Sequence, residues 1–207
     1  MELDPTELTH QQLYKLLAAL VIPRPIAWVT TLNESGTVNA APYSFFNVLS
    51  DEPPIMAFGS AARIDGSLKD TSRNIERIGE FVVNIVDEDL LGRMSVSAAD
   101  FPPEESETDA TELEVRGSTA IAPPRIALSP VSFECTHYQT IKLSERSRIV
   151  LGIIRVIHVR DGLVDRQTLR LDISKYTPVA RLYGENYAKL SSIVQVKPTN
   201  YDDIRGQ

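Results

Sequence analysis

The sequence predicts a mainly β protein with helices at its periphery, either a β-barrel or a β-sandwich. Three observations lead to this fold class. Short runs rich in β-branched and aromatic residues recur along the chain, turn residues separate them, and apolar residues at helical spacing occur only in short stretches. No internal repeat or clear linker divides the 207 residues, which predicts a single domain over residues 1–190 and a tail over 191–207.

The first predicted element is a short amphipathic helix near the amino terminus. Thr9 and Gln12 have the spacing of a capping box, in which each side chain satisfies a backbone N–H group of the other residue. Pro23 cannot continue a helix, so the helix is expected to end before it. Leucines recur at helical spacing between these limits, at Leu13, Leu16, Leu17 and Leu20.

A β-hairpin is predicted next. Residues 26–32 form its first strand, and the turn 33–36 ends on Gly36, which can adopt the positive φ that hairpin loops often need. The second strand leads into residues 42–47, where hydroxyl and amide groups alternate with aromatic rings. Such a mixture suits a flat ligand with polar edges, and the alternative is an ordinary strand whose polar residues face solvent.

The middle of the chain alternates strands with helices. A strand is expected over residues 55–59, a loop over 59–67, an amphipathic helix over 68–78 and an apolar strand over 81–86. Residues 87–98 predict a further helix whose buried face consists of Leu90, Leu91 and Met94.

The last part of the domain contains one strong strand and little else that is regular. Residues 100–112 are acidic and contain prolines, which predicts a surface excursion, with a lid as the alternative. Residues 149–159 are the longest strand candidate, and a turn at 161–162 with a short return strand at 163–164 follows.

Composition excludes several classes of function. The formal net charge of −7 argues against nucleic-acid binding, because a phosphate backbone would be repelled. No stretch approaches the roughly 20 apolar residues that span a bilayer, and the amino terminus lacks the features of a secretory signal, so no membrane association is expected. The single cysteine, Cys135, lies in an apolar stretch and is expected to be a buried, inert thiol in a cytoplasmic protein.

Several familiar catalytic patterns are missing from the sequence. There is no Gly-x-Gly-x-x-Gly after a strand, no Walker A loop and no Gly-x-Ser-x-Gly elbow. The three histidines show no metal-ligand spacing, so neither a metal site nor a catalytic side chain is predicted. Cys135 and His137 could form a nucleophile–base pair, although core packing explains them as well.

A second candidate site begins the helix over residues 68–78. Lys69, Asp70 and Thr71 stand at its start, where backbone N–H groups are unpaired and the helix dipole is positive. A lysine and a hydroxyl at such a helix start predict a phosphate cradle. In the alternative interpretation Asp65 or Ser67 caps the helix and Lys69 is solvated.

Taken together, these motifs resemble those of the flavin reductase-like, FMN-binding split-barrel proteins, in particular the branch that includes flavoredoxin. The matching segments cover most of residues 9–190 in the expected order. They are PRPIAWVTT (23–31), NAAPYSFFN (39–47), DEPP (51–54), LKDTSRNIER (68–77), FVVNIV (81–86) and PVARLYGENY (178–187). The resemblance implies a six-stranded antiparallel Greek-key split β-barrel that forms a homodimer, with FMN near the subunit interface.

The resemblance also assigns the residues that bind FMN. The isoalloxazine ring and ribityl chain would lie against Trp28, Val29, Thr30, Thr31, Tyr43, Ser44, Phe45, Phe46 and Asn47. The phosphate end would be held by Ser60, Arg63, Lys69, Asp70 and Thr71, and Tyr187 would approach from the carboxy-terminal segment. FMN suits a site with one cationic pocket better than FAD does, because FAD carries a second phosphate and an adenine.

The function implied is that of an oxidoreductase in which NADH or NADPH delivers hydride to flavin N5. The reduced flavin would go to a partner monooxygenase, or electrons would pass to another redox partner. One alternative is a non-catalytic FMN-binding protein or electron carrier that does not use nicotinamide. Another is a related barrel that binds pyridoxal phosphate or haem, and the lack of an evident axial ligand disfavours haem.

Overall fold

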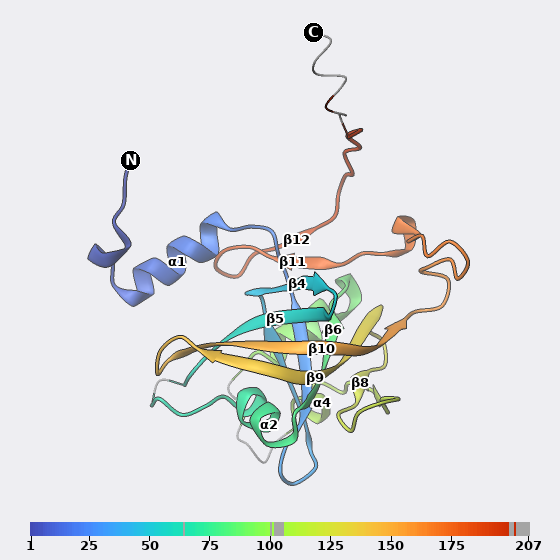
Figure 1. The fold of residues 1–207 in the computed structure, drawn as a ribbon, viewed down its shortest axis with the longest axis horizontal. Coiled ribbons are helices and arrows are strands. Elements are labelled where there is room, and N and C mark those ends of the chain that lie inside the picture. The colour runs from blue at the N-terminus through green and yellow to red at the C-terminus, as the bar shows by residue number, and fades with distance from the viewer. Residues whose placement is uncertain (64, 100, 102–105, 199–200, 202–207) are drawn as a thin grey trace.

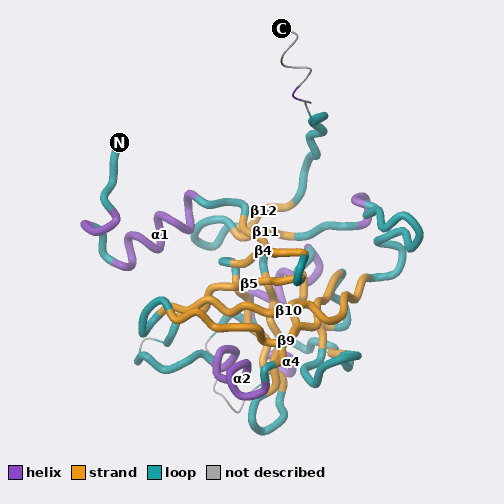
Figure 2. The backbone as a smooth tube through the Cα atoms, viewed as in Figure 1, coloured by secondary structure: helices purple, strands orange, loops and turns teal. Residues whose placement is uncertain are grey.

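The structure is a computed structural model that describes residues 1–63, 65–99, 101, 106–198 and 201. Strands dominate these residues, and four short α-helices accompany them (Figures 1 and 2). The α-helices are α1 (His10–Leu20), α2 (Asp70–Ile78), α3 (Leu91–Val96) and α4 (Glu107–Ala110). The 3-10 turns are η1 (Pro5–Glu7), η2 (Glu88–Leu90) and η3 (Ile173–Lys175). Within the described residues, no helix is both long and apolar enough to cross a membrane.

The strands form one large sheet and two small ones. The large sheet contains β2 (Ala27–Leu32), β3 (Val38–Tyr43), β4 (Phe46–Asp51), β5 (Pro54–Ala61), β6 (Glu80–Ile85), β9 (Val131–Lys142) and β10 (Ser147–Val159). The small sheets contain β1 (Arg24–Pro25), β11 (Val179–Arg181) and β12 (Tyr187–Lys189), and β7 (Val115–Arg116) with β8 (Arg125–Ile126).

The large sheet is antiparallel and curls back on itself. Its order is β3-β2-β6-β9-β10-β5-β4, so its two edge strands, β3 and β4, follow each other in the chain with only Ser44 and Phe45 between them. The edges lie close together, because the rings of Tyr43 and Phe58 are 4.7 Å apart and the Gly59 N–H donates to the Phe45 carbonyl at 2.8 Å. Over the described residues no strand ladder joins β3 to β4 or β5. The mainly β, antiparallel prediction is therefore confirmed, whereas a closed six-stranded barrel is not.

Two hydrophobic cores lie on opposite faces of β2. Alternate residues of a strand point to opposite faces, so Val29 enters the inner core with Phe58 and Phe81, while Trp28 enters the outer core. The outer core lies between the sheet and the segments around α3, β8 and β11, and includes Leu90, Met94, Ile126 and Val179. Of the three residues predicted to form the buried face of the 87–98 stretch, Leu90 and Met94 are fully buried and Leu91 is partly buried against the outer core.

Most of the predicted elements are present. α1 begins after Thr9 with both hydrogen bonds of the capping box, from Gln12 N–H to Thr9 Oγ1 at 3.3 Å and from Thr9 N–H to Gln12 Oε1 at 2.9 Å. The hairpin is β2 and β3, and the later strands are β5, β6 and β10. β9 was not singled out in the sequence. Its pairing with β10 shifts register at two places, once at Tyr138 in β9 and once at Arg155 in β10. β9 also buries polar side chains, Ser132 and Glu134 among them, so its buried face is not marked by apolar residues.

Two predicted helices have different bounds in the structure. α2 begins at Asp70 rather than at residue 68, and Lys69 is its N-cap. The stretch predicted as one helix over residues 87–98 divides into η2 and α3. Helix ends are the least predictable part of a sequence pattern.

The prediction that residues 100–112 form a surface excursion is wrong for their second half. Ser106, Glu107, Thr108 and Thr111 are buried, and α4 packs against β3. The Ser106 hydroxyl donates to the Val38 carbonyl at 2.9 Å. The acidic composition gave no sign of this contact because the buried residues are polar and bind backbone groups. Residues 100 and 102–105 lie outside the described residues.

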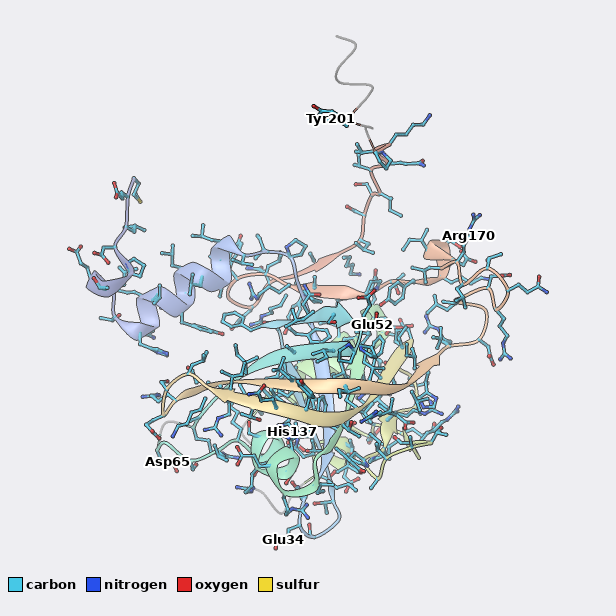
Figure 3. All side chains as sticks on the ribbon, in the orientation of Figure 1. Glu34, Glu52, Asp65, His137, Arg170 and Tyr201 are labelled. Atoms are coloured by element: carbon cyan, nitrogen blue, oxygen red, sulfur yellow. The ribbon has the colours of Figure 1, made fainter. Side chains whose placement is uncertain are left out.

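The two ends of the chain extend from one side of the sheet (Figure 1). α1 and the segment after β12 lie on the side of the small β1-β11-β12 sheet, whereas α2 lies on the opposite side. Figure 3 shows Tyr201 far out on the carboxy-terminal arm. Residues 191–198 form no helix or strand and are exposed, as the predicted tail requires.

Candidate functional site

A hollow between β3, the start of α2 and the segments around α3 and α4 is the candidate functional site. Its volume is about 490 Å³, including the part that is open to solvent. Five of the predicted cofactor residues line it, namely Tyr43, Arg63, Lys69, Asp70 and Thr71. The other lining residues are Asn39, Ala41, Pro42, Ser97, Ala98, Ala99, Phe101 and Glu107. We call this hollow the α2 pocket.

The start of α2 provides backbone donors to the α2 pocket. Lys69 is the N-cap, with an extended backbone, and its side chain makes no capping hydrogen bond. Across the described residues, the N–H groups of Asp70, Thr71 and Ser72 have no acceptor. The helix runs to Ile78, and Gly79, with φ 75°, ends it. The alternative in which Asp65 or Ser67 caps the helix is wrong, because Asp65 accepts hydrogen bonds from Ser67 instead.

The charged side chains of the α2 pocket leave one cation without a partner. Asp70 is almost buried and forms ion pairs with both Arg63 and Arg73. Lys69 is half-buried, and no carboxylate in the described part of the chain forms an ion pair with it. The lining carries two cationic side chains, Arg63 and Lys69, and two carboxyl groups, Asp70 and Glu107. Its formal charge is therefore zero, in a chain whose formal charge is −7, and Arg73 beside Asp70 adds one positive charge.

Tyr43 supplies a buried polar group at the same place. It is 8% exposed, and its hydroxyl makes no hydrogen bond within the described residues, although the Thr71 and Ser60 hydroxyls lie nearby. Burial raises the pKa of Tyr43 to about 12, so the hydroxyl keeps its proton at neutral pH. A buried hydroxyl without a partner costs free energy and is an observation that a bound ligand would explain.

An amide network beneath the α2 pocket fixes Thr71. Asn39 Nδ2 donates to Thr71 Oγ1 at 2.9 Å and to Thr31 Oγ1 at 3.2 Å, and Asn74 Nδ2 donates to Thr31 Oγ1 at 3.0 Å. These groups are all buried and connect α2 to both strands of the hairpin. The start of α2 is therefore held in place by hydrogen bonds to the β2–β3 hairpin.

Glu107 is a pocket residue that the sequence did not indicate. Its Oε2 accepts the Ala40 N–H at 3.1 Å, which places a carboxyl group in the wall of the α2 pocket. Burial raises the pKa of Glu107, and the nearby Asp70 acts in the same direction, while hydrogen bonds from the Glu107 and Ala40 N–H groups and the charge of Arg63 oppose them. A single acidic residue within an acidic stretch carries no sequence signal of burial.

The predicted ring-binding residues 44, 45 and 47 lie at the seam between β3 and β4. Phe45 is 46% exposed, and Ser44 accepts a hydrogen bond from Arg24 Nε at 3.3 Å. The Arg24 guanidinium lies 5.7 Å from the Phe45 ring centroid and also donates to the Val21 carbonyl at 2.9 Å and the Leu182 carbonyl at 2.7 Å. Arg24 therefore ties the end of α1 and the carboxy-terminal segment to this seam, a role that no sequence pattern indicated.

The other predicted site residues do not line the α2 pocket, although Thr31 and Ser60 lie next to residues that do. Trp28, Val29, Thr30 and Thr31 are all fully buried, and Phe46 belongs to the inner core. Ser60 is buried and bonded to Ser72 at 2.8 Å, and Asn47 is exposed with its Oδ1 bonded to the Val48 N–H. Tyr187 is half-buried and packs against Arg181. Contact of these residues with a flavin stays a prediction.

Cys135 and His137 do not form a reactive pair. The Cys135 side chain is fully buried in the inner core, and burial raises the pKa of its thiol to about 12. The His137 ring instead bonds to Thr140 at 2.8 Å. The described residues contain no group of histidine, cysteine and carboxylate side chains that could hold a metal.

Comparison with known families gives one clear match. Residues 19–180 match the sequence profile of the family described as "Flavin reductase like domain". An uncharacterized protein of Aquifex aeolicus is 39% identical over 189 residues, which cover 91% of this chain and 95% of that protein. The protein YwrF of Bacillus subtilis is also 39% identical over 189 residues, covering 89% of this chain and 92% of YwrF.

Solved structures show the same similarity. The 2-nitrobenzoate 2-nitroreductase NbaA of Pseudomonas fluorescens superposes with a TM-score of 0.89 at 36% identity, over 97% of this chain and 98% of NbaA. Nitrilotriacetate monooxygenase component B of Bacillus cereus gives 0.90 at 34% identity, over 95% and 98%. A Shewanella frigidimarina protein with a split-barrel domain gives 0.79 at 18% identity, over 96% and 100%, which supports the split-barrel fold.

Proposed function

The chain belongs to the flavin reductase-like domain family, and we propose that within this family it is an NAD(P)H-dependent FMN oxidoreductase. The α2 pocket is the observation that supports FMN as the cofactor. It combines an unpaired Lys69, the free N–H groups at the start of α2 and the buried Tyr43 hydroxyl. Each of these is a donor without an acceptor, and together they fit a single phosphate group.

The phosphate of FMN would be held by Lys69, by the N–H groups of Asp70 and Thr71, and by Arg63. Arg63 and Arg73 already neutralise Asp70, so the carboxylate at the helix start does not cancel the positive field. A pocket with one unpaired lysine supports a monophosphate ligand, which is why we propose FMN rather than a dinucleotide.

The flavin ring would lie at the seam, where residues 44–47 follow the pocket wall formed by residues 41–43. Phe45 and the Arg24 guanidinium offer a partly exposed apolar and cationic surface there. When bound, FMN supplies the hydride chemistry, and the chain contributes binding, orientation and exclusion of water. This division of labour requires no acid or base from the protein.

Relatives suggest where the electrons go. Because a monooxygenase component B is 34% identical to this chain, we propose that the reduced flavin serves a partner monooxygenase. The nitroreductase NbaA, at 36% identity, makes a nitroaromatic acceptor the second option. We further propose a homodimer with FMN near the subunit interface, in a cytoplasmic setting that suits a buried, unpaired thiol.

An absorption spectrum followed by anaerobic reduction tests the proposal. The protein mixed with FMN is passed through a desalting column, and NADH or NADPH is then added without oxygen. Retention of the yellow chromophore and its bleaching by either nicotinamide are expected. FMN retention without nicotinamide oxidation would instead identify an electron carrier. Loss of all flavin on the column, together with no nicotinamide oxidation when FMN is supplied in excess, would refute the cofactor assignment. A parallel assay with 2-nitrobenzoate separates the two acceptors.

A further inference from the structure

Glu107 is a buried carboxyl group that the proposed function does not use. It is 7% exposed, and its Oε2 accepts the Ala40 N–H of β3 at 3.1 Å. The backbone N–H of Glu107 also donates to this carboxyl group, and no side chain in the described part of the chain does so. The neighbouring Ser106 fixes α4 to β3 through the Val38 carbonyl. The backbone therefore holds the Glu107 carboxyl in the wall of the α2 pocket whether or not a ligand is bound.

The surroundings of Glu107 make its charge sensitive to an anion. The charged and titratable groups that face it come from three other segments and are Tyr43 on β3, Arg63 in the loop after β5, and Lys69 and Asp70 at the start of α2. Arg63 is already paired with Asp70, which leaves Glu107 with no cation of its own among the described residues. A phosphate entering the α2 pocket would place a second negative charge beside this carboxylate in a partly buried site.

Resting on the proposed function, we propose that Glu107 takes up one proton from solvent when the phosphate group of FMN occupies the α2 pocket. The carboxylate becomes a carboxylic acid, no other bond forms or breaks, and the new hydroxyl can donate a hydrogen bond where the carboxylate could only accept one. Tyr43 lines the same pocket, and its buried hydroxyl, close to those of Thr71 and Ser60, forms no well-aligned hydrogen bond within the described residues.

The sign of the effect follows from linkage. A ligand that binds with proton uptake binds more tightly at low pH, so FMN affinity should fall as pH rises. The fall is steepest between the pKa of Glu107 in the free protein and its higher pKa in the complex, where it approaches about tenfold per pH unit for one proton. The second ionisation of the FMN phosphate, near pH 6, also changes FMN affinity with pH, but it does so equally for every variant.

Titration calorimetry counts the protons. FMN is titrated into the protein at several pH values in two buffers of different ionisation enthalpy, and the difference between the buffers gives the proton uptake. Wild type is compared with Glu107→Gln, which keeps the size of the side chain and an acceptor for the Ala40 N–H. Glu114→Gln is the matched control, because Glu114 is an exposed carboxylate in the same part of the chain. Riboflavin, which lacks the phosphate, serves as a second ligand.

The inference predicts an uptake that is about one proton larger for wild type and Glu114→Gln than for Glu107→Gln, and no such difference with riboflavin. Equal uptake in wild type and Glu107→Gln would overturn it. If Glu107→Gln does not fold, absence of net uptake by wild type between pH 6 and pH 8 would overturn it equally. Failure of the protein to bind FMN at any pH would refute the proposed function and this inference together. Tight FMN binding without proton linkage would refute the inference alone.

Discussion

Replacing Lys69 with alanine tests the phosphate half of the site most directly. Lys69 is the N-cap of α2 but makes no capping hydrogen bond, so its side chain can be removed without loss of a helix contact. Two charges about 4 Å apart attract each other by about 4 kcal/mol in a partly solvated site. Desolvation and the other donors reduce the net contribution of a charge-assisted hydrogen bond to about 1–3 kcal/mol. We therefore expect the Kd for FMN to rise by about 5- to 150-fold.

Quenching of flavin fluorescence measures this change. Lys15→Ala, which removes an exposed lysine from α1, is the matched control and should leave the Kd unchanged. Riboflavin should bind both variants like wild type, because it has no phosphate to lose. A folded Lys69→Ala protein with wild-type FMN affinity would show that Lys69 does not contact the phosphate, and the pocket assignment would fail with it.

Three further predictions concern the sheet and its buried groups. Gly152→Ala should lower the free energy of unfolding by about 1–3 kcal/mol in urea titrations, because a Cβ there would lie 2.3 Å from Phe81 Cζ; unchanged stability would show that the inner core is loosely packed. Cys135 should react with a thiol reagent only after unfolding, since its thiol is fully buried, and rapid labelling of native protein would contradict its position. Burial alone would raise the pKa of Glu134, but hydrogen bonds from the Thr119 and Ala120 N–H groups and from His158 outweigh it and lower the pKa. This carboxylate therefore stabilises the fold above its ordinary pKa of 4.5, and the contribution is lost as pH falls through the lower folded value. In Glu134→Gln the free energy of unfolding should fall less steeply as pH is lowered, and an acid transition identical to that of wild type would refute this.

The sequence predicted the fold well where local pattern and tertiary packing agree. The capping box of α1 and the alternation of β2 both appear as expected, because each depends on neighbouring residues. β9 was harder to recognise because it buries polar side chains such as Ser132 and Glu134, so burial does not follow hydrophobicity along the strand. The strand count and the open seam depend on long-range pairing, which a local pattern cannot specify.

In the candidate site, too, residues that depend on local sequence could be predicted and residues that depend on long-range contacts could not. The cluster at the start of α2 could be predicted, because the chemistry of a helix start is local and Lys69, Asp70 and Thr71 are contiguous. Glu107 could not, since its burial depends on contact between α4 and β3, far apart in the chain. Nor could Arg24, whose partners include the Leu182 carbonyl, 158 residues away. In both cases a charged side chain binds a backbone group. Because nearly every residue has the same backbone groups, the sequence contains no sign of which one is the partner.

The open seam has a consequence for mutational analysis. β3 and β4 are the edge strands of the sheet, so each presents one row of backbone N–H and C=O groups that no neighbouring strand in the described part of the chain uses. On β3, α4 residues bind the Ala40 N–H and the Val38 carbonyl. A flat ligand seated beside residues 44–47 would find much of its polar recognition in peptide groups, which alanine substitution leaves in place. An alanine scan would then report strong effects in the α2 pocket and weak ones along the seam, even if both halves contributed equally to binding. Proline or backbone-ester substitutions, which remove a single N–H group, are the changes able to measure what the seam contributes.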